Sequence, residues 1–514
     1  MQRALRRSPG AAAVGGGRDP PALASPSSTR RIPLPPPPRR HRRQRAASAF
    51  AAASTASAPQ AKRQRAPAAS APPPASFSRA DLVPLGASSG LLVSPLGLGT
   101  WAWGNRLLWG YEAGRDDPRL RAAFARAAAA GVNLWDTGDS YGTSLPGAGG
   151  QGTSGAAVGV RDGRAEALLG EFDREVQAAA AAEAGRGGGG GGRDGGGGGG
   201  LLGRFLRGLG GGGAKAARSS PARAIVATKL AAYPWRVTPE STVAAARASR
   251  RRVAGLPPAA PRGRGDSGGG GTDDDDDAPL PPLGVAQAHW STANYQPFQE
   301  RAQLEGLARA YEQGVASSVG LSNYGPKELA RAADFFERRI GAPPAVAQVQ
   351  WSLLSDTPEQ RDVAALCRAR GIAMIGYSPL ALGALSGRYD GGGGRAGGGR
   401  AGGDGDNADA PRPLPPGLRG YLLADILRKA APVLACVRAV AEERGRTPAQ
   451  VAIAWVSARG AIPIPGAKTA AMVDEAVGAV AGWRLGAGEM DELAEAQRRC
   501  GAGRLMPRNV FQTK

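Results

Sequence analysis

The sequence predicts an α/β fold in which eight parallel strands alternate with helices and close into a (β/α)8 barrel. Short apolar runs alternate with alanine-rich or amphipathic helical segments along most of the chain, and eight such runs can be counted. Runs of this kind are typical of strands buried on both faces, which favours a parallel sheet covered by helices. Once glycine- and proline-rich segments are set aside, roughly 300 residues remain, the size of one such barrel with extra helices.

The first run lies within residues 91–103 and closes on Gly99, Thr100 and Trp101. A helix is expected over 116–130, because two aspartates occupy its first turn and Gly131 follows it. The other seven runs are 132–136, 224–229, 284–289, 316–321, 345–350, 372–376 and 461–464. Periodicity predicts intervening helices at 164–176, 239–254, 299–313, 326–340, 358–370 and 432–444, with further C-terminal helices at 447–459 and 469–481.

Four segments interrupt this pattern, at 143–163, 178–220, 257–282 and 390–417. They are rich in glycine or proline and poor in apolar side chains, so burial cannot offset the entropy lost on ordering them. We expect them to be disordered surface insertions. The first two flank the helix that follows the second strand, and they either expand the surface or cover the mouth of the barrel. The ordered barrel domain is expected over 82–514.

Residues 1–79 hold fourteen arginines, one lysine and a single acidic residue, and so carry most of the net charge of +22. This composition, rich in Arg, Ala, Ser and Pro, predicts an organelle transit peptide. A disordered RNA-binding arm is the competing interpretation. The chain has no apolar stretch of about 18 residues, so no membrane-spanning helix is expected. The three widely spaced cysteines predict neither a disulfide framework nor a metal site, which suits a reducing compartment.

Ionisable side chains stand at the ends of three consecutive predicted strands. Asp136 ends the second strand, with Tyr141 in the loop beyond it, Lys229 ends the third strand and His289 ends the fourth. The C-terminal strand ends of such a barrel form the active-site face. Any one of these residues alone could be a cap or a packing residue, whereas four at neighbouring strand ends predict a catalytic site.

The residue types suit proton donation to a carbonyl oxygen. An unperturbed tyrosine has a pKa of about 10, and a nearby ammonium would lower it. We therefore expect Lys229, fixed by Asp136, to lower the pKa of Tyr141, while His289 hydrogen-bonds the oxygen. No side chain can deliver hydride, so a nicotinamide cofactor is implied.

These motifs resemble those of the aldo-keto reductase superfamily. The resemblance runs from about Leu82 to the C-terminus apart from the four insertions, and its motifs are D-T-G-D-S-Y-G, A-T-K, Q-A-H-W, V-G-L-S-N-Y, Q-V-Q, G-Y-S-P-L-A-L-G and I-P-I-P-G-A-K. It implies a barrel that binds NADPH, with a catalytic tetrad of Asp136, Tyr141, Lys229 and His289. It implies cofactor contacts from Gly99, Thr100, Trp101, Asp136, Ser322, Asn323, Gln348, Tyr377, Ser378, Pro379, Leu380, Gly383, Lys468 and Glu475.

Within that set, the resemblance implies that Ser322, Asn323 and Gln348 hold the carboxamide and that Tyr377 stacks on the nicotinamide ring. Lys468 would face the 2′-phosphate, which favours NADPH over NADH. Ala476 stands where the family often has an asparagine that contacts adenine. Trp101, Trp103, Trp109 and Trp290 are expected either to line an apolar substrate pocket or to belong to the core.

More narrowly, three stretches resemble plant and algal chloroplast aldo-keto reductases associated with plastoglobules: G-T-W-A-W-G-N-x-L-L-W-G-Y near 99–111, A-A-Y-P-W-R at 231–236 and the C-terminal N-V-F-Q-T-K. The expected location is the chloroplast, in the stroma or peripherally on plastoglobules, with the mitochondrion as the alternative. The expected activity is reduction of an aldehyde or ketone, and the expected partner is a small carbonyl substrate rather than a nucleic acid. The competing hypothesis is an NADPH-binding redox sensor or scaffold with little turnover.

Overall fold

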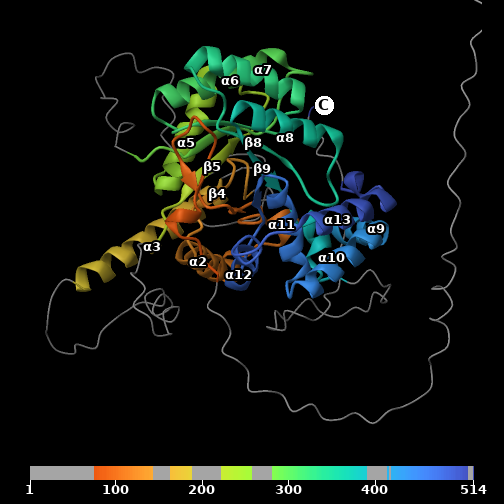
Figure 1. The fold of residues 1–514 in the computed structure, drawn as a ribbon. Coiled ribbons are helices and arrows are strands. Elements are labelled where there is room, and N and C mark those ends of the chain that lie inside the picture. Colours follow the sequence, from red (N-terminus) through yellow and green to blue (C-terminus); the bar gives the residue numbers. More distant parts are fainter. Residues whose placement is uncertain are drawn as a thin grey trace, which may run out of the picture. The chain divides into compact units, whose positions relative to one another are not determined.

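Eight parallel strands form the centre of the structure, a computed structural model that describes residues 75–142, 163–187, 221–257, 280–389, 414–415, 418–506 and 513. The strands are β3 (Gly97–Gly99), β4 (Leu134–Asp136), β5 (Ile225–Leu230), β6 (Val285–Ala288), β7 (Val319–Ser322), β8 (Val346–Gln350), β9 (Ala373–Tyr377) and β10 (Ile462–Ile464). They lie side by side in chain order. The first and last strands also meet, since Gly99 bridges Gly466 and its amide donates to the Pro465 carbonyl at 3.0 Å. The sheet is therefore a TIM-type barrel, as the sequence predicts (Figure 1).

A short hairpin packs against the N-terminal end of the barrel. Its strands β1 (Val83–Pro84) and β2 (Leu92–Val93) are antiparallel. Val93 is buried in one apolar cluster with Leu134 and Val346, the first residues of β4 and β8. The run at 91–103 is thus divided between a hairpin strand and barrel strand β3. Because the hairpin covers the N-terminal ends of the strands, a functional site is expected at their C-terminal ends.

Helices surround the barrel. They are α1 (Arg106–Trp109), α2 (Ala113–Ala129), α3 (Arg164–Gly187), α5 (Pro239–Ala254), α6 (Pro297–Glu312), α7 (Pro326–Ile340), α8 (Pro358–Arg370), α9 (Leu418–Lys429), α10 (Ala431–Glu443), α11 (Pro448–Ala458), α12 (Ala470–Val477) and α13 (Ala487–Cys500), with 3-10 turns η1 (Arg79–Asp81), η3 (Ala381–Ser386) and η4 (Ala502–Arg504). Aromatic side chains fill the layer between strands and helices: the ring of Trp135 on β4 stacks on Phe124 of α2 at 4.7 Å.

The predicted helices are present; the structure adds the short helix α1, and three longer helices also differ from the prediction. Helix α3 continues to Gly187, through residues expected to begin an insertion at 178. Its alanine-rich C-terminal half has high helix propensity, which explains the extension. Helices α9 and α13 were not predicted. Both pack on α10, and in Figure 1 they lie together at one side of the barrel. The remaining insertion residues, 143–162, 188–220, 258–279 and most of 390–417, lie outside the described residues.

The folded unit begins before Leu82, where the sequence places its start. The Phe77 amide donates to the Ala130 carbonyl at 2.8 Å, and the Phe77 side chain packs against the main core. Gly131, at φ +79°, lies so close to the Phe77 carbonyl that a Cβ there would be 2.3 Å from its oxygen. Residues 75–79 therefore belong to the barrel domain, although they were assigned to the transit peptide, and residues 1–74 lie outside the described residues.

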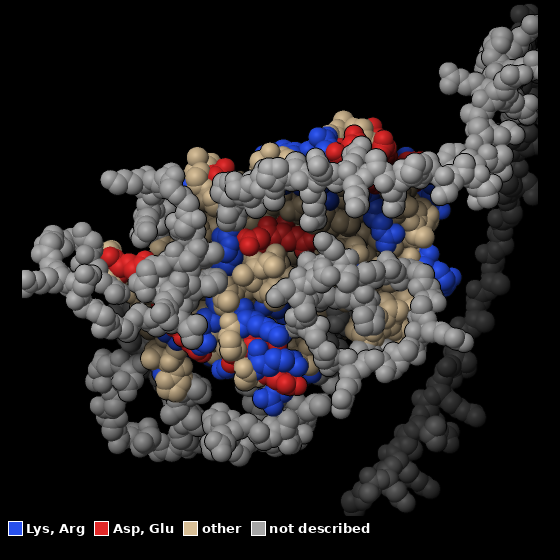
Figure 2. Space-filling model, turned by 90° about the horizontal axis from the view of Figure 1, so that it is seen from below, with Lys and Arg blue, Asp and Glu red and all other residues tan. Residues whose placement is uncertain are grey.

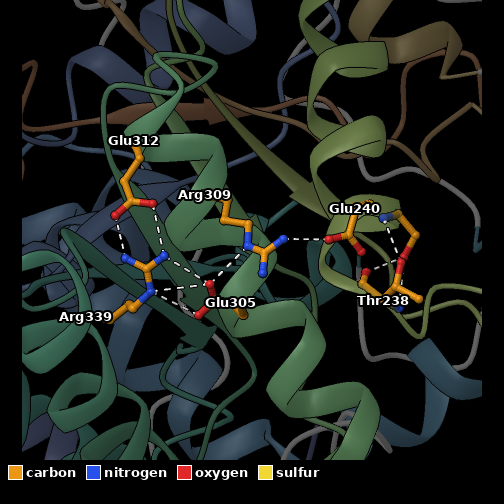
Figure 3. A network of polar contacts seen from close by, with 7 residues as sticks. Thr238, Glu240, Glu305, Arg309, Glu312 and Arg339 are labelled. Atoms are coloured by element: carbon orange, nitrogen blue, oxygen red, sulfur yellow. Dashed lines mark hydrogen bonds and ion pairs between the residues drawn. The ribbon is translucent and has the colours of Figure 1, made fainter.

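Charged side chains outside the barrel are largely paired. Arg309 on α6 contacts both Glu240 of α5, at 2.5 Å, and Glu305 of its own helix, at 3.0 Å (Figure 3). Arg339 of α7 joins Glu305 and Glu312. On the face drawn in Figure 2, basic and acidic side chains of the described residues are interspersed. None of the described helices combines the length and apolar character needed to cross a bilayer.

Candidate active site

The C-terminal ends of the strands bring together the polar side chains that the sequence singles out. Asp136 is the last residue of β4, Lys229 is the penultimate residue of β5, and His289 directly follows β6. Ser322 ends β7 and Gln348 lies within β8. Since the strands are parallel neighbours, these residues share one end of the barrel.

Asp136 accepts the hydrogen bonds that organise the base of the site. The Lys229 ammonium lies 2.6 Å from each of its carboxylate oxygens, and the Gln348 side-chain amide donates to Oδ1, also at 2.6 Å. All three side chains are buried. A buried ion pair is tolerated only when its geometry is good and its remaining hydrogen-bonding positions are occupied. Gln348 occupies one of those positions on Asp136. Gln348, which the resemblance assigns to the carboxamide, thus also fixes the carboxylate.

Tyr141 lies directly beside this ion pair. Its half-buried ring is 5.0 Å from the Lys229 ammonium and 5.9 Å from the His289 ring, which it meets edge-on. Its amide donates to the Gly138 carbonyl at 3.0 Å, which closes a tight turn after β4. The four residues of the expected tetrad therefore occupy one site.

The pKa of Tyr141 differs from the expectation drawn from the sequence. Burial raises the pKa of its phenol well above the usual value, and the negative charge of Asp136 raises it further. Burial lowers the pKa of the Lys229 ammonium, against the opposing charge of Asp136. The expected lowering of the Tyr141 pKa is not found, because burial and the charge of Asp136 both raise it. The phenol accordingly keeps its proton throughout the neutral range.

Asn323 links three strand ends. Its side-chain amide donates to the His289 carbonyl at 2.9 Å and to Ser322 Oγ at 3.1 Å. Its side-chain oxygen accepts a hydrogen bond of 2.8 Å from the Tyr377 hydroxyl. These contacts place three of the residues that the resemblance assigns to the nicotinamide end of a cofactor next to one another and next to His289.

Backbone strain concentrates in the segments expected to bind a cofactor. Among the described non-glycine residues, those with a left-handed φ are Asn323 (63°), Ser378 (53°), Ala381 (49°) and Leu382 (58°). All follow β7 or β9. Gly383, at 101°, continues the same turn, which also includes Pro379 and Leu380. Such conformations are costly and cluster at ligand clamps. This turn therefore has the character of a cradle for a ligand.

The remaining cofactor candidates lie at the end of the first strand, after the last strand and, for Glu475, on α12. The Thr100 amide and hydroxyl both donate to the Asp136 carbonyl, at 2.9 and 3.1 Å, so the end of β3 at Gly99 is tied to the site. The Lys468 ammonium lies 5.5 Å from the centre of the Trp109 ring. The Glu475 carboxylate is paired with Arg388, which sequence analysis did not single out, at 2.9 Å.

The four tryptophans differ in burial. Trp101 is 39% exposed and meets Trp109 edge-on at 5.7 Å. Trp290 lies 4.9 Å from the His289 ring. Trp103 is buried, 5.5 Å from Trp135 in the layer outside the barrel, and its indole N–H donates to the Ala467 carbonyl. Trp103 is therefore a core residue and not a wall of a substrate pocket.

Sequence analysis assigned no role to Asp139 and Arg236, which the structure pairs at the edge of the site. Asp139 lies within the quoted D-T-G-D-S-Y-G motif, and its position two residues before Tyr141 was a signal that could have drawn attention to it. Arg236 ends the A-A-Y-P-W-R stretch. No local pattern connects the two residues, which are 97 positions apart.

Comparison with known proteins agrees with this geometry. Residues 281–498 match the model of the Aldo/keto reductase family. Over 424 residues the chain is 36% identical to the chloroplastic pyridoxal reductase of Arabidopsis thaliana, an alignment that covers 82% of this chain and 88% of that protein. The chain belongs to the aldo/keto reductase family. It is accordingly an oxidoreductase that acts on carbonyl compounds, and its family uses nicotinamide cofactors.

Two further similar proteins are more distant than this relative. A probable aldo-keto reductase of Glycine max is 29% identical over 192 residues, which is 37% of this chain and 49% of that protein. The glycerol dehydrogenase of Gluconobacter oxydans superposes with a TM-score of 0.50 at 18% identity, covering 85% of this chain and all of the other. At that identity the second likeness supports the barrel fold alone.

Proposed function

We propose that this aldo/keto reductase uses NADPH to reduce an aldehyde to a primary alcohol. The observation that carries the proposal is the buried Asp136–Lys229 ion pair, which lies at one strand-end face with Tyr141 and His289. A carbonyl oxygen placed between the phenol and the imidazole would meet a proton donor and a hydrogen-bonding group on the same side.

The four side chains have distinct tasks in this reaction. The bound nicotinamide supplies hydride to the carbonyl carbon. Tyr141 donates its phenolic proton to the carbonyl oxygen as negative charge develops there, because an alkoxide is a far stronger base than a phenolate. The Lys229 ammonium, 5.0 Å from the ring, stabilises the phenolate that remains, and Asp136 holds the ammonium in place. His289 orients the oxygen.

The chain offers a consistent set of groups for the cofactor. Ser322, Asn323 and Gln348 present hydroxyl and amide groups suited to the carboxamide, and Tyr377 offers a ring beside them. The strained turn over Ser378–Gly383 suits the pyrophosphate. The ammonium of Lys468 suits a 2′-phosphate, which is why we propose NADPH rather than NADH.

Pyridoxal is the first substrate to test. The Arabidopsis relative, whose name states a pyridoxal reductase, aligns over 82% of this chain. Pyridoxal is an aromatic aldehyde, and Trp101 and Trp290 offer part-exposed rings on which its pyridine ring could stack. The same relative is chloroplastic, which together with the arginine-rich N-terminal segment supports import into the chloroplast. A peripheral association with plastoglobules stays a prediction.

The test is NADPH oxidation with pyridoxal and a panel of other aldehydes, using wild type and Tyr141→Phe. Loss of the phenolic proton should lower kcat at least about 100-fold, the scale of general acid catalysis. Tyr311→Phe, which changes a part-exposed tyrosine on α6, is the control and should retain full activity. Equal rates for wild type and Tyr141→Phe would contradict the mechanism. Tight NADPH binding by a wild type that turns over no carbonyl would favour the redox-sensor hypothesis instead.

A further inference from the structure

Asp139 is a buried carboxylate that none of the proposed chemical steps uses. It lies three residues after Asp136 and two before Tyr141 and is 5% exposed. Burial raises its pKa, against the charge of Arg236. A carboxylate in such a place is costly unless it is paired and hydrogen-bonded. Its partners therefore indicate what it does.

Those partners lie at the end of β5, where Lys229 is located, and in the loop that follows this strand. The Asp139 amide donates to the Lys229 carbonyl at 3.0 Å. One of its carboxylate oxygens accepts the Ala231 amide at 3.1 Å, and the other accepts a guanidinium N–H of Arg236 at 2.5 Å. Through both its backbone and its side chain, Asp139 thus holds the loop that carries Tyr141 against the strand that carries Lys229.

Arg236 is itself fixed from three directions. Its guanidinium donates to the Ala231 carbonyl at 2.8 Å and lies 4.7 Å from the centre of the Tyr233 ring. Its backbone carbonyl accepts a hydrogen bond of 3.2 Å from the side-chain amide of Gln299 on α6. The same amide donates to the Tyr233 carbonyl at 2.6 Å. The backbone of the segment that carries Arg236 is therefore anchored to α6.

The loop that follows β4, residues 137–142, depends on contacts of this kind to keep its conformation. It contains Gly138, and it ends at Gly142, which has a φ of +92°. Both residues leave the backbone more freedom than other residues would. Thr137 and Asp139 are hydrogen-bonded to β5 and to the loop that follows it, and two of these hydrogen bonds end on the Asp139 carboxylate.

We propose that Asp139 and Arg236 are positioning residues that hold the phenol of Tyr141 at its distance from the Lys229 ammonium. The expected effect on kcat rests on the proposed function. The contacts by which Asp139 and Arg236 hold the loop do not depend on it. Neither residue touches the reacting atoms. Misplacing a reacting group by about 1 Å can lower a rate about 100-fold, so loosening this loop should slow proton donation.

Four variants test the proposal in the full-length protein. Arg236→Met removes the charge while retaining a long side chain, Arg236→Lys retains the charge, and Asp139→Asn/Arg236→Met removes both charges. Arg309→Met is the matched control, because Arg309 is also paired with carboxylates but lies on the outer helices. Hydrogen exchange of the amides at 137–142, NADPH binding followed by cofactor fluorescence, and steady-state kinetics are measured for each.

We expect Arg236→Met to speed exchange at 137–142 by at least tenfold and to lower kcat about 10- to 100-fold. KM and the NADPH dissociation constant should stay within about threefold of wild type, Arg236→Lys should recover part of kcat, and Arg309→Met should match wild type. The double variant should be no slower than Arg236→Met, since both changes release the same contact.

Unchanged exchange at 137–142 in Arg236→Met would overturn the proposal, as would a fall in kcat matched by an equal loss of NADPH affinity. The exchange measurement needs no turnover. If wild type reduces no carbonyl, the proposed function fails while faster exchange in Arg236→Met still supports the fastening of the loop.

Discussion

Lys229 brings a positive charge into the interior of the barrel, where its side chain is 1% exposed. Burial alone disfavours the charged form and lowers the pKa of the ammonium. The two contacts of 2.6 Å to Asp136 offset this cost, and Gln348 occupies one of the same carboxylate oxygens. The buried charges of Lys229 and Asp136 are therefore each tolerated because the opposite charge lies beside them.

Lys229→Met should destabilise the fold as well as abolish activity. It leaves the buried Asp136 carboxylate without its counter-charge, and breaking such a pair costs about 3–5 kcal/mol in free energy of unfolding. Urea denaturation at pH 7.5 measures the loss. The double variant Lys229→Met/Asp136→Asn removes both charges and should recover most of the stability while staying inactive. A single variant as stable as wild type would contradict the view that the two charges depend on each other.

At the scale of elements, glycines set how closely the helices around the barrel approach. Gly170 on α3 faces the backbone of α5, and a Cβ there would lie 1.8 Å from the Val253 carbonyl oxygen. Gly306 on α6 has a similar role against α5, where a Cβ would lie 2.6 Å from the Pro239 carbonyl oxygen. Gly488 near the start of α13 has no atom within 4 Å of that position.

Gly170→Ala should therefore destabilise the protein although alanine is the better helix former. Separating two packed helices costs about 1–3 kcal/mol in free energy of unfolding, more than the gain in helix propensity. Gly488→Ala makes the same change where space is open and should be neutral or stabilising. Thermal unfolding of the two variants beside wild type provides the measurement. If both substitutions changed the thermal stability in the same direction, the helix spacing at Gly170 would be shown to be adjustable.

The whole barrel is completed by segments from its two ends. Closure occurs where Gly99 of β3 meets Gly466 beyond β10, and residues 75–79 pack under the turn after α2. The chain also returns to the site, because the Gly325 amide donates to the Thr513 hydroxyl at 2.7 Å. The N-terminal limit of the folded unit is therefore defined by contacts rather than by composition.

Truncation at two nearby positions tests that limit. A chain that begins at residue 75 keeps Phe77 and its hydrogen bond to Ala130, whereas one that begins at residue 80 loses both. The shorter chain should be less stable by about 1–2 kcal/mol, because Phe77 is half-buried. Denaturant unfolding of both chains, with Phe77→Ala in the longer one as a control, measures this difference. Equal stability of the two chains would place the boundary after residue 79.

The sequence by itself determined the barrel and the identity of the residues at its mouth. Buried strands and amphipathic helices have local periodicities, and each strand ends at a recognisable residue, so Asp136, Lys229 and His289 could be placed on one face without coordinates. Helix α13 was missed although strong helix formers such as Ala, Glu and Leu are frequent in it. Helix α9 was missed because it follows directly on a glycine-rich insertion.

Only the tertiary structure decided how those residues act on one another. Gln348 and Asp136 are 212 positions apart, and Asp139 and Arg236 are 97 apart, so their contacts depend on the register and closure of the sheet. The burial of Trp103 is also decided by the tertiary structure, because it depends on which side of the strand layer the indole lies. The direction of the Tyr141 pKa shift also depends on three dimensions, because it is the balance of burial and surrounding charges, and no local pattern contains that balance.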